Sequence, residues 1–181
     1  MATPLTTARG VWIDDSDCDL DDFRGEVSRE TALADYPLAS DVRHGVLVYS
    51  AATNANADRH ALQTEFIRAL ADGPGVVVFE GAFDHDVVDR ASAAFTALIA
   101  AQRAAGGVAG DHFGTVGAND RIWSAARKLA LHDPTVFAEY YANDALAMVC
   151  EAWLGPRYQV TSQVNVVNPG GAPQVPHRDY H

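Results

Sequence analysis

Cysteine and long apolar runs are both scarce in this sequence of 181 residues. Its two cysteines, Cys18 and Cys150, lie far apart and show no CxxC or Cys/His spacing, which argues against a disulfide framework or a zinc finger. No segment approaches the roughly 18 uninterrupted apolar residues of a membrane helix, and the N-terminus has no signal-peptide core. We therefore expect a cytoplasmic protein that is not inserted in a membrane.

Positive charge is also in short supply. The 13 Lys and Arg residues stand against 24 Asp and Glu residues, which gives a formal net charge of -11. A chain with this charge repels a phosphate backbone, so we expect no nucleic-acid partner. The hydrophobic content of 48% is nevertheless enough for one folded domain with a core.

The acidic residues crowd into the first forty positions, where six aspartates between Asp14 and Asp22 surround Cys18. An EF-hand loop would need a glycine and a distal glutamate at fixed spacings, and both are missing. The pattern favours a solvated acidic extension over residues 1–40, followed by the N-terminal portion of a single domain over residues 41–181.

Helical and strand patterns are mixed along the rest of the chain, which predicts an α+β fold. Strands are expected at 44–50 and within 75–83, and helices over 59–71, from Asp84 or Asp86 onward, and in three short pieces over 120–156. We expect the last of these helices to bury an apolar stripe formed by Leu146, Val149, Cys150 and Trp153.

A glycine-rich stretch at 106–117 separates two of these helical regions. It lacks the Lys-Ser/Thr pair of a phosphate-binding P-loop and has no strand directly before it. A loop that carries His112 toward an active site is the interpretation that remains.

Near the C-terminal end, residues 158–167 alternate with a period of two. Valines and Tyr158 fall on one face, while Gln159, Thr161, Gln163 and Asn165 fall on the other, as in a half-buried strand. The polar face either meets solvent or lines a polar pocket, and the alternation alone leaves both interpretations open.

The turn after this strand leads to a His-x-Asp motif at His177 and Asp179. In an extended segment the two Cα atoms lie about 6.6 Å apart on one face, so both side chains can reach one ion. They then supply two of the three ligands of a 2-His-1-carboxylate site, although an isolated motif of this kind also fits a surface or ion-paired histidine. His181 lies about 13 Å further along an extended strand, which is too far to complete the set. None of the five earlier histidines, His44, His60, His85, His112 and His132, is a convincing third ligand.

The segments "SQVNVVNPGGAPQVPHRDYH" and "FIRALADGPGVVVFEGAFDHDVVDRASAAF" resemble the phytanoyl-CoA dioxygenase family of Fe(II)- and 2-oxoglutarate-dependent oxygenases. The resemblance runs from about Leu62 to the end of the sequence, and its most specific part is the combination of strand, turn and HxDxH. It implies N-terminal helices that lead into a double-stranded β-helix, a jelly roll of the cupin type.

The resemblance also implies a site and a chemistry. His177 and Asp179 become Fe(II) ligands, Gln163 and Asn165 become contacts for 2-oxoglutarate or substrate, and oxygen is the co-reactant that hydroxylates a small organic substrate. The carboxylate of Asp179 favours hydroxylation, because halogenating relatives lack it and bind a halide in its place.

The family's second iron histidine and its 2-oxoglutarate-binding arginine come downstream of the motif, and this sequence contains neither. We therefore expect an incomplete jelly roll, a truncated chain with poor activity alone, and an exposed strand edge that favours association, including a homo-oligomer. Two alternatives stay open. One is a non-catalytic remnant or binding module of the same fold, and the other is a zinc-dependent hydrolase that uses His177, Asp179 and either His112 or His181.

Overall fold

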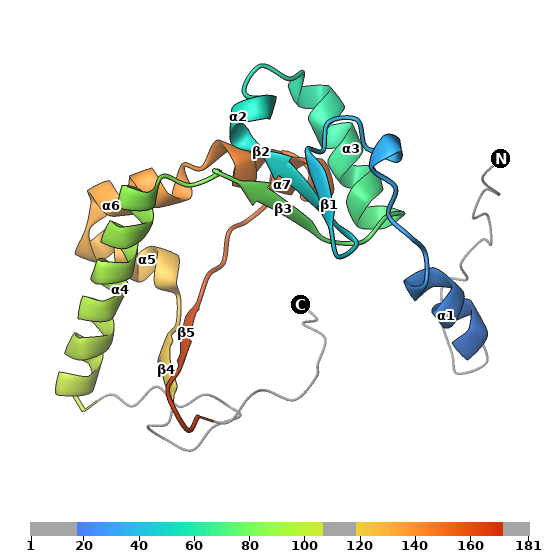
Figure 1. Cartoon of the computed structure of the whole chain (residues 1–181). Coiled ribbons are helices and arrows are strands. Elements are labelled where there is room, and N and C mark those ends of the chain that lie inside the picture. Colours follow the sequence, from blue (N-terminus) through green and yellow to red (C-terminus); the bar gives the residue numbers. More distant parts are fainter. Residues whose placement is uncertain (1–17, 107–118, 172–181) are drawn as a thin grey trace.

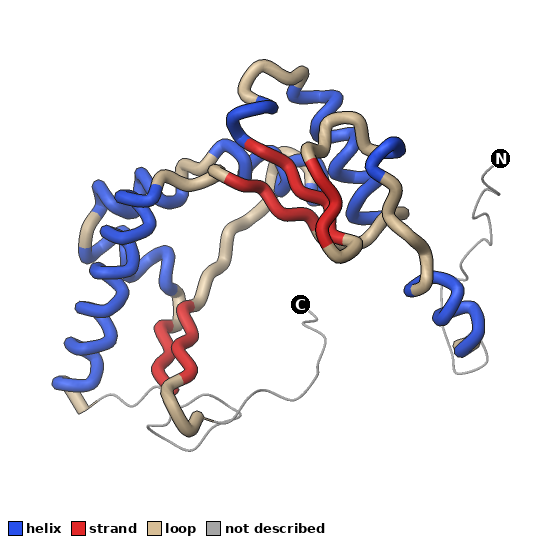
Figure 2. The backbone as a smooth tube through the Cα atoms, in the orientation of Figure 1, coloured by secondary structure: helices blue, strands red, loops and turns tan. Residues whose placement is uncertain are grey.

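The computed structural model describes residues 18–106 and 119–171. Helices and strands are mixed, which confirms the α+β class, and they follow one another along an arch (Figure 1). The strands of the described residues form two small open sheets (Figure 2). One lies at the top of the arch, which we call the crown, and the other lies in the part that descends at the left, which we call the lower arm. The jelly roll stays a prediction, because two small open sheets are not a closed double-stranded β-helix.

The crown contains a three-stranded sheet in the order β1-β2-β3. β1 (Asp41–Arg43) and β2 (Val46–Ser50) form an antiparallel hairpin, and β3 (Val77–Glu80) runs parallel to β2. His44 and Gly45 form the hairpin turn with φ angles of 53° and 82°, the pair of positive values that a type I′ turn requires. Strands were predicted at β2 and β3, whereas the three residues of β1 are too few to show a period.

One face of this sheet packs on α3 (Arg59–Ala71) and α7 (Asp144–Leu154). Leu47 and Tyr49 of β2 alternate onto this face, and Tyr49 meets Phe66 of α3 edge to face at 4.9 Å between ring centroids. Leu62, Ala69 and Met148 complete the fully buried cluster together with Tyr36. These contacts give the crown a core of its own.

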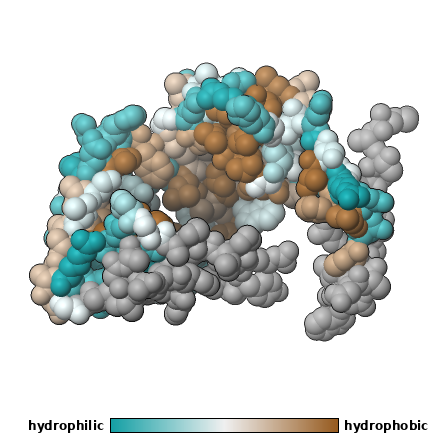
Figure 3. Space-filling model, turned by 60° about the horizontal axis from the view of Figure 1, so that its bottom comes forward, coloured by the Kyte–Doolittle hydropathy of each residue, from teal (hydrophilic) through white to brown (hydrophobic). Residues whose placement is uncertain are grey.

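The opposite face of the sheet carries an ionic bridge. Arg43 donates to Asp41 at 2.8 Å and to Glu80 of β3 at 2.5 Å. The strand register places these three side chains on the same face as Val48, which is only 2% exposed. Beside the bridge, Val76 and Val78 stay exposed, and the underside of the molecule shows a central hydrophobic area (Figure 3).

Three helices begin directly after an aspartate N-cap. The N-caps of α3, α4 (His85–Ala104) and α6 (Pro134–Tyr141) are Asp58, Asp84 and Asp133, each of which accepts hydrogen bonds from backbone N–H groups of the first turn. Pro134 occupies the first position of α6. Local sequence chemistry is therefore sufficient to place these helix starts.

The expected apolar stripe of α7 was wrong in its orientation. Leu146 is 43% exposed and Trp153 is 53% exposed, whereas Met148 is buried against α3. Met148 belongs to the core cluster of the crown, and Val149 packs against it. Asp144 and Glu151 share a helix face with Met148, and both accept from Arg59 of α3 at 2.9 Å.

The lower arm consists of α4, α6 and α5 (Ala125–His132), which enclose a second core. Ala91 and Ala94 of α4 meet Leu129 of α5 and Val136 of α6 there. The three-helix prediction for 120–156 was wrong at its start, because residues 119–122 form a strand, β4 (Asn119–Ile122). β4 is a strand because it pairs with a strand that is distant in sequence, and a local sequence pattern does not predict such pairing.

Part of the acidic N-terminal segment is helical and exposed to solvent. Asp19 caps α1 (Leu20–Val27), all of whose residues are exposed. Residues 51–58, between β2 and α3, begin with a short helix, α2 (Ala51–Asn54), and Leu33–Asp35 form a 3-10 turn, η2. The boundary at residue 40 stays a prediction, and within the described part of the chain no helix is long and apolar enough to cross a membrane.

Candidate metal and cosubstrate site

The strand that precedes the His-x-Asp motif pairs with β4. β5 (Val164–Val167) runs antiparallel to it, with Asn119 opposite Val167 and Arg121 opposite Asn165. The resulting ribbon lies beside α4, on the inner side of the lower arm (Figure 1). The turn that leads toward the motif therefore begins at the end of this ribbon.

One face of the ribbon is tied to α4. Ile122 is 1% exposed, and Gln102 of α4 donates to the backbone oxygen of Arg121 at 3.1 Å. Asp120 accepts from Arg103 Nε at 2.8 Å, and the Arg103 guanidinium holds the pKa of this carboxyl below its ordinary value. A hydrogen bond from Asn168 lowers the same pKa further.

The opposite face contains the two predicted cosubstrate contacts. Gln163 Oε1 accepts from Arg121 Nε at 2.9 Å, and the Arg121 guanidinium lies 4.1 Å over the ring of Trp123. Asn165 is exposed and stands directly across from Arg121 in the register. The structure therefore brings Gln163 and Asn165 together beside a guanidinium.

The strand itself is shorter than predicted. Residues 158–163 are not paired in a sheet, and Val160 and Val166, which were expected on a buried face, are 48% and 37% exposed. Among the described residues only β4 pairs with β5, and on the face toward α4 Ile122 is buried whereas Val166 is not. The alternation predicted which side chains share a face but not how far each face is covered.

Ser162 connects the ribbon to the helices of the lower arm. Its backbone oxygen accepts from Ala125 N at 2.9 Å, and its Oγ accepts from Ala126 N at 2.9 Å. The usual cap position of α5 is Ser124, which has a left-handed φ of 52° and makes no side-chain cap. Ser162 thus caps α5 from another part of the chain, and Tyr141 bonds its hydroxyl at 2.7 Å.

After β5 the chain turns through Asn168–Gly171. The turn is closed by a bond from Gly171 N to the backbone oxygen of Asn168 at 2.8 Å. Asn119 lies beneath it with 5% exposure, and neither atom of its amide has a hydrogen-bond partner among the described residues. Such a buried amide is unusual, because desolvation without a partner is costly.

The predicted metal ligands His177 and Asp179 lie outside the described residues, as do His112, His181 and nearly all of the glycine-rich stretch. The remaining histidines are scattered: His44 lies in the hairpin turn, His60 on α3, His85 on α4 and His132 on α5. Over residues 18–106 and 119–171 no three His, Cys, Asp or Glu side chains gather as a metal site.

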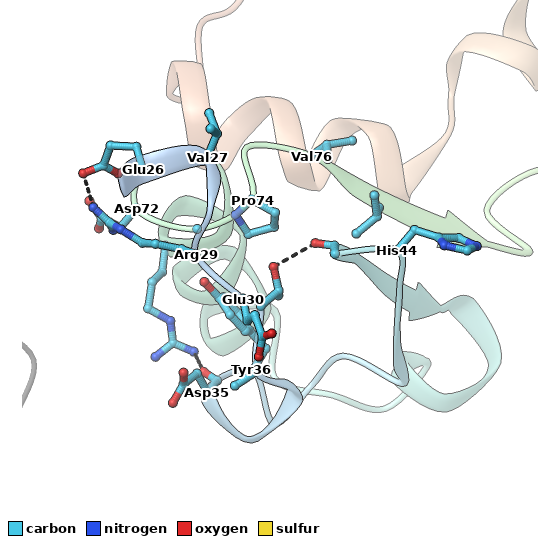
Figure 4. Close-up of a pocket in the computed structure, with 16 residues that line it drawn as sticks. Glu26, Val27, Arg29, Glu30, Asp35, Tyr36, His44, Asp72, Pro74 and Val76 are labelled. Atoms are coloured by element: carbon cyan, nitrogen blue, oxygen red, sulfur yellow. Dashed lines mark hydrogen bonds and ion pairs between the residues drawn. The ribbon is translucent and has the colours of Figure 1, made fainter. Parts of the chain in front are cut away.

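A separate groove of about 1130 Å³ lies where the chain leaves α1 and meets the hairpin turn (Figure 4). Two arginines that line this groove already donate hydrogen bonds within the protein. Arg29 donates to Glu26, and Arg68 donates to the backbone oxygen of Asp35. Arg68 also stacks on Tyr36 at 4.8 Å. This groove lies at the other end of the arch from the ribbon.

Arg121 is the site residue that sequence reasoning missed. It precedes Gln163 by 42 positions and was expected to lie in a helix. The local sequence gives no strand signal there, because residues 119–123 (NDRIW) do not alternate between polar and apolar residues.

Comparison with known proteins gives one match. The family model for phytanoyl-CoA dioxygenase (PhyH) matches residues 71–181, which is more than half of the chain. No curated protein and no solved structure matches. The matched range includes α4, the whole ribbon and the His-x-Asp motif. The chain belongs to the phytanoyl-CoA dioxygenase family, a family of oxygenases.

Proposed function

We propose that the protein is an Fe(II)- and 2-oxoglutarate-dependent dioxygenase that hydroxylates a small organic substrate. The family match over residues 71–181 carries this proposal, because it includes both the ribbon and the motif. The reaction partners are then the substrate, 2-oxoglutarate and oxygen. A cytoplasmic location stays a prediction.

The side chains of the motif suit the proposed metal. A neutral imidazole and an ionised carboxylate are the donor types of a non-haem Fe(II) site, and His177 and Asp179 supply one of each. When bound, the iron supplies the redox chemistry with oxygen. The chain's part is to keep His177 neutral and Asp179 ionised. We assign neither a third ligand nor a 2-oxoglutarate-binding arginine among residues 1–181.

The ribbon face suits an oxygen-rich ligand. Gln163 and Asn165 present amide groups beside the guanidinium of Arg121. Amide N–H groups donate to carboxylate oxygens and orient them. We assign Gln163 and Asn165 the role of orienting 2-oxoglutarate or the substrate.

The test is succinate formation from 2-oxoglutarate by a protein that also contains the remaining ligand and arginine. Turnover should require Fe(II) and oxygen, and Asp179→Ala should abolish it. The 181-residue chain alone should show little or none, because two ligands hold iron loosely. Activity without oxygen in a zinc-loaded protein would instead indicate a hydrolase, and succinate formation that survives Asp179→Ala would remove the ligand assignment.

A further inference from the structure

Helix α1 carries an apolar stripe that is open to solvent. Leu20, Phe23 and Val27 are 59%, 61% and 64% exposed, and their spacing of three and four residues places them on one face of the helix. A helix of eight residues is marginal in water by itself, because helices shorter than about 12–15 residues depend on tertiary packing. The stripe therefore calls for a surface on which it can pack.

The lower face of the crown sheet, the face that carries Val48, is also apolar and open. Val78 pairs with Val48 across the sheet and is 44% exposed. Val76 lies two residues before Val78, on the same face, and is 45% exposed. On the underside of the molecule, hydrophobic residues gather both at the centre and on α1 at the right (Figure 3). Two open apolar surfaces thus lie on the same side of the molecule.

The groove of Figure 4 lies between these two surfaces. Its lining includes Val27 from α1 and Val46, Pro74 and Val76 from the crown (Figure 4). Closing such a groove removes apolar area of both walls from water, and this burial favours closure. Closure here brings the stripe of α1 onto the lower face of the crown sheet.

A short tether limits where α1 can go. Thr31 Oγ1 donates to the backbone oxygen of Gly45 in the hairpin turn at 2.8 Å, which ties the connecting chain to the crown. Only residues 28–30 separate Thr31 from the end of α1, a reach of at most about 14 Å. Val46 follows Gly45 directly, so the tether keeps the stripe within reach of the lower face.

We propose that α1 is a strap that closes over the lower face of the crown sheet. Its stripe of Leu20, Phe23 and Val27 packs on Val76 and Val78, and residues 28–30 are the hinge. Closure also covers part of the concave side of the arch that the ribbon borders (Figure 1). The inference is independent of the proposed function, because all of its residues belong to α1, its tether or the crown.

The test is the rate of disulfide formation in the 181-residue chain, after Cys18→Ser and Cys150→Ala have removed the natural thiols. Leu20→Cys combined with Val78→Cys leaves the rest of the stripe in place. This pair should form a disulfide within one chain at least about tenfold faster than Asp22→Cys combined with Val78→Cys, because only the first pair is held at a high effective concentration. Asp22 is the matched control, since it lies on the other side of the same helix.

Hydrogen exchange of the chain with its natural cysteines covers the case in which the cysteine variants do not fold. The backbone amides of α1 should exchange at least about tenfold more slowly than unstructured amides, and Val76→Gln combined with Val78→Gln should remove this protection. Leu131→Gln, at a position of α5 that is 73% exposed, should leave it unchanged.

Equal disulfide rates for the two pairs, or α1 amides that exchange at the unstructured rate in the unchanged chain, would overturn the strap. Protection that survives the double valine variant would also overturn it, because α1 would then pack elsewhere. A disulfide that links two chains, or protection that falls on dilution, would assign the lower face to a second copy and not to the chain's own α1.

Discussion

At the scale of single residues, Ser162 joins parts of the chain that are distant in sequence. Its backbone oxygen and Oγ satisfy the first two N–H groups of α5, and its hydroxyl also bonds Tyr141 of α6. The next residue is Gln163 of the candidate site. Support for the site thus reaches the helical arm through one side chain.

We predict that Ser162→Ala lowers the free energy of unfolding by about 1–2 kcal/mol, the usual cost of losing a helix cap. Urea denaturation followed by circular dichroism measures this change. Ser92→Ala is the matched control, because Ser92 is exposed on α4 and bonds only Val88 O within its own helix. Equal effects of the two substitutions would contradict the capping role.

The carboxyl group of Asp120 predicts how the stability of the folded protein depends on pH. Arg103 and Asn168 lower its pKa from the ordinary 3.8, so the folded state favours the ionised carboxylate. The stability that this provides is present above the unfolded pKa of about 3.9 and is lost as the pH falls through the lower folded value. Asp120→Asn should therefore be less stable than the unchanged protein near pH 6, with the gap closing below pH 4.

Unfolding in urea at a series of pH values between 6 and 3 tests this. A gap that widens toward acid would contradict the direction of the shift. Arg103→Gln should give the same profile, because it removes the main cause of the lowered pKa.

At the scale of elements, a buried carboxylate joins α3 to the crown sheet. Glu65 is 5% exposed and accepts from Tyr49 Oη at 3.0 Å and from Leu38 N at 3.2 Å. Burial, and after it the bond to Glu65, raises the pKa of Tyr49, so this phenol stays protonated as a donor. The bonds explain how an acidic residue is accommodated in the core.

We expect Glu65→Ala to lower the free energy of unfolding by about 2–4 kcal/mol, because two buried donors lose their acceptor. Glu65→Gln keeps an acceptor oxygen and should cost clearly less. Thermal and urea unfolding measure both changes. Glu139→Ala, at an exposed ion pair between α6 and α4, should cost less than about 1 kcal/mol. A Glu65→Ala protein as stable as that control would contradict the role of Glu65.

The elements also show how far sequence reasoning reaches. The starts of α3, α4 and α6 could be predicted, because Asp58, Asp84 and Asp133 act within one turn of their own chain. The rotation of α7 could not, since it depends on how the helix packs against α3. β1 and β4 are strands only through their partners, and their few residues show no period.

The same division applies to the candidate site. Gln163 and Asn165 share a face as the alternation predicted, because the side chains of a strand point to its two faces in turn. Their neighbour Arg121 comes from 42 positions earlier and enters only through the pairing of β4 with β5. Contacts across such distances are set by tertiary structure and leave little trace in the local pattern.

At the scale of the whole molecule, the arch keeps two packed regions apart. The crown has the aromatic core around Tyr49 and Phe66, and the lower arm has the smaller core around Leu129. The ribbon belongs to the lower arm, through α4 and α5. Its inner face and the open underside of the crown border the same concave side of the molecule (Figures 1 and 3).

The central claim is that His177 and Asp179 hold iron, and an anaerobic Fe(II) titration tests it most directly. We predict that the 181-residue chain binds one Fe(II) weakly, because it supplies two protein ligands, and that His177→Ala or Asp179→Ala removes this binding. His132→Ala, on α5, should leave it unchanged. Fe(II) binding that persists in both motif variants, or that is lost with His132, would contradict the claim.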